Sequence, residues 1–126
     1  MQDSNVNQFN FFKVHTQYSI CEGAVKIDAL KDYCNKNKIK SIGISDTNNL
    51  CGVLEFSENI SKSGTQPIIG TQIRFKYKDF YGIIPLIAKN ENGYKQIINL
   101  SSNSYLNNYE FSDPYIPFEE LLEACF

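Results

Sequence analysis

Three short polar stretches of the sequence hold residue types that could bind a metal ion or a phosphate. They are residues 15–22, residues 46–49, and Thr71 with Gln72. Each stretch follows or lies within an apolar segment predicted to be a strand, and functional groups of β/α folds collect at the carboxyl ends of strands. The candidate ligands among them are His15, Glu22 and Asp46.

The number of ligands limits what such a site could do. The chain contains one His, whereas a hydrolytic two-metal site needs several imidazoles and carboxylates to activate water. Gln72 is neutral and therefore a weak ligand for a hard divalent cation. Each candidate also has a structural interpretation: His15 as a hydrogen-bonded residue, Asp46 as a turn residue and Glu22 as a solvated turn carboxylate. We expect at most weak binding of one ion and no metal catalysis.

Other catalytic patterns are absent from the sequence. No GxSxG nucleophile elbow, P-loop or GxGxxG stretch occurs. The four cysteines contain no CxxC pair, so zinc-ribbon and zinc-finger spacings are excluded.

Strands and helices alternate in the predicted order of elements. Strands are expected at residues 11–14, 41–45, 67–75 and 81–88, with Lys78 and Asp79 at the turn between the last two. The apolar positions of the first two helices recur at helical spacing. They are Ile27, Leu30, Tyr33 and Cys34, then Val53, Phe56 and Ile60, the second helix being closed by Ser63 and Gly64.

Two further helices are expected in the second half of the chain. One begins at about Glu91, is capped by Asn90, and buries Tyr94, Ile97 and Ile98; residues 107–114 form a loop after it. The last presents an apolar stripe made of Phe118, Leu121, Leu122 and Cys125. This order predicts an α/β fold with mainly parallel strands, the first part of a distorted β/α barrel.

The length and the two ends of the chain suggest one domain or part of one. Residues 1–8 are expected to be a disordered lead-in and residues 9–126 a domain portion. A closed β/α barrel needs about 250 residues, and the final apolar stripe has no closing cap, so we expect a domain truncated at the C-terminus.

Charge and hydropathy favour a cytoplasmic location. The net charge is −2, from 12 basic and 14 acidic side chains, and the basic ones are scattered, so we expect this segment not to hold DNA by itself. No secretory signal or membrane-spanning stretch is visible. Free thiols are consistent with a reducing cytoplasm.

Four segments carry a resemblance to a known family. They are KVHTQYSICEGA (residues 13–24), SIGISDTNNLCGVLEFSENI (residues 41–60), QPIIGTQI (residues 66–73) and LIAKNENGYKQIINLSS (residues 86–102). In order and spacing they resemble the PHP domain at the N-terminus of the bacterial DNA polymerase III α subunit. The resemblance covers nearly the whole chain from Phe11.

The departures from the family pattern fall on its metal site. Where metal-competent members have His-x-His, this chain has Lys13 and His15, and where they have Asp-His-Gly-Asn it has Asp46 followed by Thr47. The family's Glu after the Pro-Ile-Ile-Gly turn is Gln72 here. The acidic residue of the first motif remains as Glu22. The six positions Lys13, His15, Glu22, Asp46, Thr47 and Gln72 thus form a vestigial site, at which the Lys13 ammonium could take the electrostatic place of a metal.

The resemblance implies a function for the whole polypeptide and another for this segment. The parent chain would be a DNA-directed DNA polymerase, with Mg²⁺ at a polymerase site beyond this segment. The segment would have no cofactor or catalytic residue. It would stabilise the rest of the α chain and dock a proofreading exonuclease subunit, among other replicase subunits, with DNA bound through the full chain.

Two other functions remain open from the residues alone. One is a stand-alone PHP-type metal-dependent phosphoesterase, which would need more His residues than are present. The other is a small binding module complete at Phe126. Metal content and the length of the reading frame distinguish them.

Overall fold

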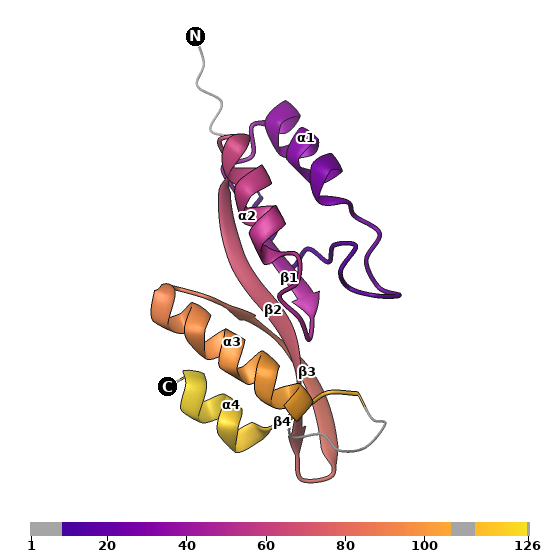
Figure 1. Cartoon of the computed structure of the whole chain (residues 1–126), viewed down its shortest axis with the longest axis vertical. Helices are drawn as coiled ribbons and strands as arrows, with labels where there is room; N and C mark the ends of the chain where they lie inside the picture. Colours follow the sequence, from indigo (N-terminus) through magenta and orange to yellow (C-terminus); the bar gives the residue numbers. More distant parts are fainter. Residues whose placement is uncertain (1–8, 107–112, 126) are drawn as a thin grey trace.

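The computed structural model describes residues 9–106 and 113–125 (Figure 1). The expected lead-in at residues 1–8 and most of the expected loop at residues 107–114 lie outside the described residues. The elements are α1 (Ile27–Asn37), β1 (Ser41–Thr47), α2 (Val53–Lys62), β2 (Gln66–Tyr77), β3 (Phe80–Ile87), α3 (Glu91–Leu106), β4 (Ile116–Pro117) and α4 (Phe118–Cys125). The predicted alternation of strands and helices is therefore confirmed.

The long strand β2 organises the sheet. β1 runs parallel to its first half, from Ser41↔Gln66 to Thr47↔Gln72, and β3 runs antiparallel to its second half, from Gly70↔Ile87 to Tyr77↔Phe80. The short strand β4 pairs in parallel with β2 at Phe75. Because β3 also pairs with β2 there, β4 must lie on the edge that β1 occupies further back. β2 thus joins two halves of the molecule, as its curved path shows (Figure 1).

The predicted first strand at residues 11–14 lies where expected but forms only an isolated parallel bridge, Val14↔Ile44. Val14 N donates to Gly43 O at 3.2 Å, and Ser45 N donates to Val14 O at 2.8 Å. The ladder stops at Thr16, because its backbone N donates to the Asp46 side chain at 2.6 Å instead of to a strand carbonyl. The neighbouring backbones approach closely here, since a Cβ at Gly43 would lie 2.7 Å from Phe12 O.

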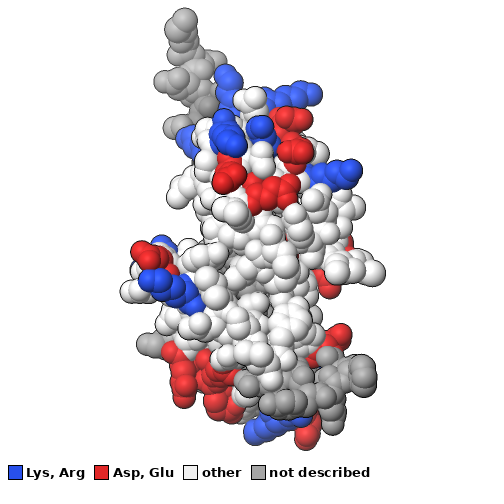
Figure 2. Space-filling model, viewed as in Figure 1, with Lys and Arg blue, Asp and Glu red and all other residues white. Residues whose placement is uncertain are grey.

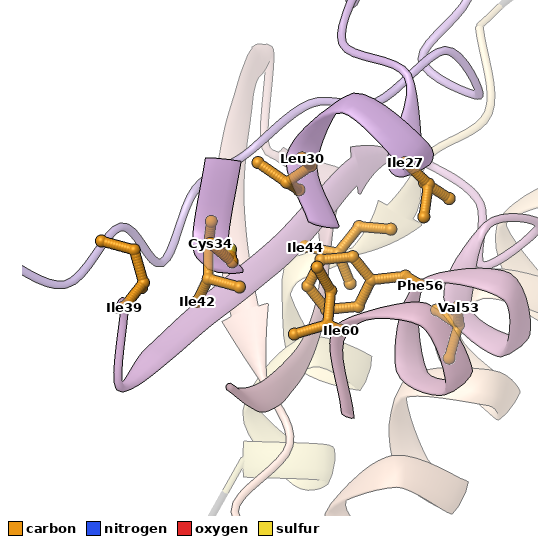
Figure 3. Packing of buried hydrophobic residues seen from close by; sticks show 9 residues of the cluster. All are labelled: Ile27, Leu30, Cys34, Ile39, Ile42, Ile44, Val53, Phe56 and Ile60. Carbon is orange, nitrogen blue, oxygen red and sulfur yellow. The ribbon is translucent and has the colours of Figure 1, made fainter. Parts of the chain in front are cut away.

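The main core lies between α1, β1 and α2 (Figure 3). Its nine buried residues are Ile27, Leu30, Cys34, Ile39, Ile42, Ile44, Val53, Phe56 and Ile60. The predicted stripes of the first two helices are confirmed, except that Tyr33 is 46% exposed. Ile27, Leu30 and Cys34 form the centre of the buried stripe of α1. Tyr33 lies at the margin of this stripe and is therefore partly exposed.

A smaller core joins β2, β4, α3 and α4, and consists of Ile73, Leu100, Ile116 and Leu121. Here two predicted stripes were partly wrong. Ile98 is 37% exposed, because α3 faces the sheet with Ile97 and Leu100. On α4, Leu121 is buried whereas Leu122 and Cys125 are exposed. Helical periodicity alone does not say which edge of a wide apolar stripe meets the sheet.

The predicted ends of elements are confirmed. Asn90 caps α3, its Oδ1 accepting from Gly93 N at 2.9 Å. Gly64 follows α2 with a φ of +75°, and Lys78 takes a φ of 53° in the turn between β2 and β3. No helix within residues 9–106 and 113–125 combines the length and apolar character needed to cross a membrane.

Candidate functional site

Asp46 is the centre of the polar region at the carboxyl end of β1. Its side chain is 1% exposed. Oδ1 accepts from Thr16 N and from Ser19 Oγ, and Oδ2 accepts from Thr16 Oγ1, each at 2.6 Å. Hydrogen bonds to an ionised carboxylate are about twice as strong as neutral ones. The carboxylate therefore fastens the loop after residue 15 to the end of β1.

The backbone around Asp46 is held from β2 as well. Thr71 Oγ1 donates to Asp46 O at 2.7 Å and lies 3.1 Å from Asn49 O. Asn48 N donates to Gln72 O at 2.7 Å. The turn that follows β1 is thus fixed by the neighbouring parallel strand.

A chain of side-chain contacts joins four of the other vestigial positions. His15 Nδ1 lies 3.3 Å from Glu22 Oε2, close enough for an ion pair when the imidazole is protonated. Thr47 Oγ1 donates to the same Glu22 oxygen at 2.5 Å, and Gln72 Nε2 donates to Thr47 Oγ1 at 3.4 Å. These contacts join the loop of residues 15–22 to the end of β1 and to β2. Lys13 is exposed to solvent at the start of this region.

Two buried polar atoms in this cluster have no hydrogen-bond partner. They are His15 Nδ1, whose approach to Glu22 lacks hydrogen-bond geometry, and Gln72 Oε1. An unpaired buried polar atom costs about 1–3 kcal/mol. Both atoms belong to residues that the sequence assigned to the vestigial site.

The residues present do not fit a hydrolytic metal centre. Asp46 already accepts three protein hydrogen bonds, and the Glu22 carboxylate is engaged by Thr47. Gln72 brings no charge. Across the part of the chain that the structure describes, no group of three or more His, Cys, Asp or Glu side chains is placed to hold a metal ion.

A hollow of about 350 Å³ opens beside the cluster. It is lined by Glu22, Thr47, Asn48, Arg74, Tyr81, Ile83 and Asp113. Arg74 Nη1 donates to Asp113 Oδ2 at 2.7 Å. The sequence offers no motif that would single out Arg74, Thr16 or Ser19. No signal in the sequence could pair Thr16 with Asp46, because the two residues are 30 positions apart.

On the other side of the loop, Tyr18 Oη donates to Glu55 Oε2 at 2.6 Å. This hydrogen bond and the carboxylate's negative charge raise the pKa of the Tyr18 phenol. The contact ties the loop to α2, so the polar region is held from α2 as well as from β1 and β2.

The chain is similar to curated proteins named DNA polymerase III subunit alpha. It is 37% identical over 117 residues to DNA polymerase III subunit alpha of Rickettsia felis and 34% identical over 123 residues to that of Haemophilus influenzae. These matches cover 92% and 95% of this chain but 10% of each relative. The chain therefore spans about a tenth of the length of the curated relatives it matches.

The fold has a counterpart among solved structures. A crystal structure of a protein from Bifidobacterium adolescentis, provisionally assigned as a metal-dependent phosphoesterase, matches with a TM-score of 0.58 and 20% identity over 77% of this chain and 33% of that one. This likeness concerns the fold, and it supports the predicted incomplete β/α barrel. The PHP domain family itself matches residues 12–126. On that match, this chain belongs to the PHP domain family.

Proposed function

We propose that the chain is the PHP segment of a bacterial DNA polymerase III α subunit, whose full polypeptide carries out DNA-directed DNA synthesis. The observation that carries this proposal is the match to relatives of that name over 92% of the chain at 37% identity. Mg²⁺ would act at the polymerase site of the full chain. We place the protein in the bacterial cytoplasm, where it would meet DNA and the other replicase subunits.

Within that polypeptide, the segment has a structural and docking role. This is supported by the way the vestigial site is filled, since its carboxylates are hydrogen-bonded to Thr16, Ser19 and Thr47. Partners would be the rest of the α chain and a proofreading exonuclease subunit.

Two activity assays on the full-length protein test this proposal. We expect Mg²⁺-dependent primer extension and no phosphoesterase activity that depends on His15 or Glu22. An inactive polymerase would reject the parent function. Phosphoester hydrolysis lost in a His15→Ala variant would instead support the phosphoesterase alternative, which the 20% identity to the Bifidobacterium protein does not favour.

Restoring the family's ligands tests the vestigial site directly. The triple variant Lys13→His, Thr47→His, Gln72→Glu supplies two imidazoles and one carboxylate. Two of the three positions, Thr47 and Gln72, already contact each other. We expect it to take up Zn²⁺ or Mn²⁺ that the parental protein does not retain, as measured by elemental analysis after gel filtration. A matched control replaces three exposed residues on three different helices, Lys36→His, Lys62→His and Lys95→Glu, where the new side chains cannot converge. Equal metal uptake by the two triple variants would contradict the proposal.

Co-purification tests the docking role. Full-length protein and the exonuclease subunit of the same bacterium should elute as one complex. A protein lacking this segment should lose that complex while extending primers, provided that it remains folded.

A further inference from the structure

Beyond the site at the end of β1, the second half of the β2–β3 hairpin gathers cations and aromatic rings on one face. The pairing of Lys76 with Tyr81 and of Arg74 with Ile83 places these four side chains on the same side of the sheet. Tyr115, which precedes β4, completes the group. Arg74, Lys76, Tyr81, Ile83 and Tyr115 are called the hairpin patch below.

The cations of the hairpin patch lie over its rings. Arg74 Cζ is 4.5 Å from the centroid of the Tyr81 ring. Lys76 Nζ is 5.4 Å from the same centroid and 5.8 Å from that of Tyr115. The two tyrosine rings meet edge to face at 5.4 Å. Such contacts preorganise a charged aromatic surface, because each side chain restricts the rotamers of its neighbours.

The hairpin patch is open to solvent. Tyr81 is 41% exposed and Ile83 is 56% exposed. They line the 350 Å³ hollow that leads back to Thr47 and Asn48, which is large enough to take a nucleobase with its sugar. The opposing carboxylates are Asp113, paired with Arg74, and Glu22 at the far end of the hollow.

We infer that the hairpin patch contacts single-stranded nucleic acid. Proteins that hold single strands combine cations along the phosphate backbone with aromatic rings on which bases stack, and this combination needs no particular base sequence. Lys76 supplies a cation for a phosphate. The Arg74 guanidinium donates to Asp113 through Nη1 and has further N–H donors that could bind a second phosphate. Tyr81 and Ile83 offer an apolar surface to a base.

This inference goes beyond the proposed function and revises an expectation drawn from the sequence. The basic residues are scattered along the chain, which argued against contact with DNA through this segment. The hairpin brings two of them together beside Tyr81, and Tyr115 joins from a segment 34 positions further along the chain. On the face viewed in Figure 2, charged side chains lie mainly toward the two ends of the molecule, with a further group at the left edge near the middle.

The experiment uses the full-length protein and a photoreactive single-stranded oligothymidylate, with crosslinked peptides identified by mass spectrometry. We expect crosslinks at Tyr81 or Tyr115, and acetylation of Lys76 slowed at least about threefold by the oligonucleotide. The protection should fall as salt is raised, because displaced counterions oppose binding. Acetylation of Lys31 and Lys36 on α1 serves as the internal control.

Two variants complete the test. Tyr81→Phe keeps the ring and should keep the protection of Lys76, whereas Tyr81→Ser should lose it. The inference is overturned if oligothymidylate crosslinks elsewhere in the protein but leaves the hairpin patch unlabelled and Lys76 unprotected. It is equally overturned if polyglutamate protects Lys76 as well as the oligonucleotide does, since the partner would then be an acidic protein segment. Primer extension is measured separately on the unmodified protein, so failure of the polymerase proposal is recognised independently.

Discussion

The two ends of β2 are covered by different elements and to different extents. At the first end, β1 and the helices α1 and α2 enclose nine apolar residues around Phe56, and the polar loops that meet at Asp46 lie directly above them. At the other end, four buried residues form the core, and β3 exposes Ile83, Ile84 and Ile87. The first end couples a dense core to a hydrogen-bonded polar centre, whereas the second presents its apolar and aromatic side chains outward.

This difference follows from the connections. A parallel β–α–β unit returns its helix over the sheet, so α2 packs against β2 and shares the main core with β1. A hairpin returns at once along its own strand and brings no helix with it, so β3 has to be covered by something that lies elsewhere in the sequence. α3 and α4 meet this need only in part, by packing against Ile73 and Ile116.

The largest effect is expected from the densest part of the first core. Phe56 is fully buried, and Phe56→Ala should lower the free energy of unfolding by about 3–5 kcal/mol, because the transfer free energy of the ring is lost and a cavity remains. The matched control is Leu54→Ala on the same helix, where the side chain is 72% exposed; its cost should stay below about 0.5 kcal/mol. Urea denaturation of both variants checks the prediction, and equal losses would show that α2 is not held by this core.

The next largest effect should come from the polar centre above that core. Asp46→Ala leaves the donors of Thr16 and Ser19 without their acceptor, at an expected cost of about 2–4 kcal/mol. Asp46→Asn keeps the shape and one acceptor oxygen, so its loss should be smaller. Hydrogen exchange at the Thr16 amide should accelerate in both variants more than exchange in β3. A loop that stayed protected in Asp46→Ala would contradict the role assigned to this carboxylate.

A smaller effect is expected in the second core. Leu121 is 3% exposed on the eight-residue helix α4, and Leu121→Ala should cost about 2 kcal/mol, at the low end for a buried Leu because a short helix at the margin of a core can relax into the space. Leu122→Ala, on the exposed side of the same helix, is the control. If Leu121→Ala cost as much as Phe56→Ala, the contrast between the two ends of β2 would fail.

The sequence predicted the elements of both ends but the burial of only one. Most helices and strands were placed correctly, because apolar spacing and residues such as Asn90 and Gly64 act locally. The two-residue strand β4 was not predicted, and the strand expected at residues 11–14 forms only an isolated bridge. Ile98 and Leu122 were assigned to buried stripes and are exposed, because the helix faces depend on partners far along the chain. The site positions could be named from family motifs, but the three donors that saturate Asp46 could not, since hydroxyl groups of Ser and Thr occur throughout the sequence.

The smallest predicted effect concerns the contact that joins the polar loop to α2. Because Glu55 raises the pKa of Tyr18 in the folded protein, the stabilising contribution of this hydrogen bond is complete below the unfolded-state pKa of about 10 and is lost as the pH rises through the folded-state pKa. Tyr18→Phe should therefore be less stable than the parental protein at neutral pH, and the difference should shrink in alkaline solution. Thermal unfolding across that pH range measures it, with Tyr33→Phe on the exposed side of α1 as the control. A difference that stayed constant with pH would contradict the role assigned to the phenol proton, although Tyr18 Oη lies 2.6 Å from Glu55 Oε2.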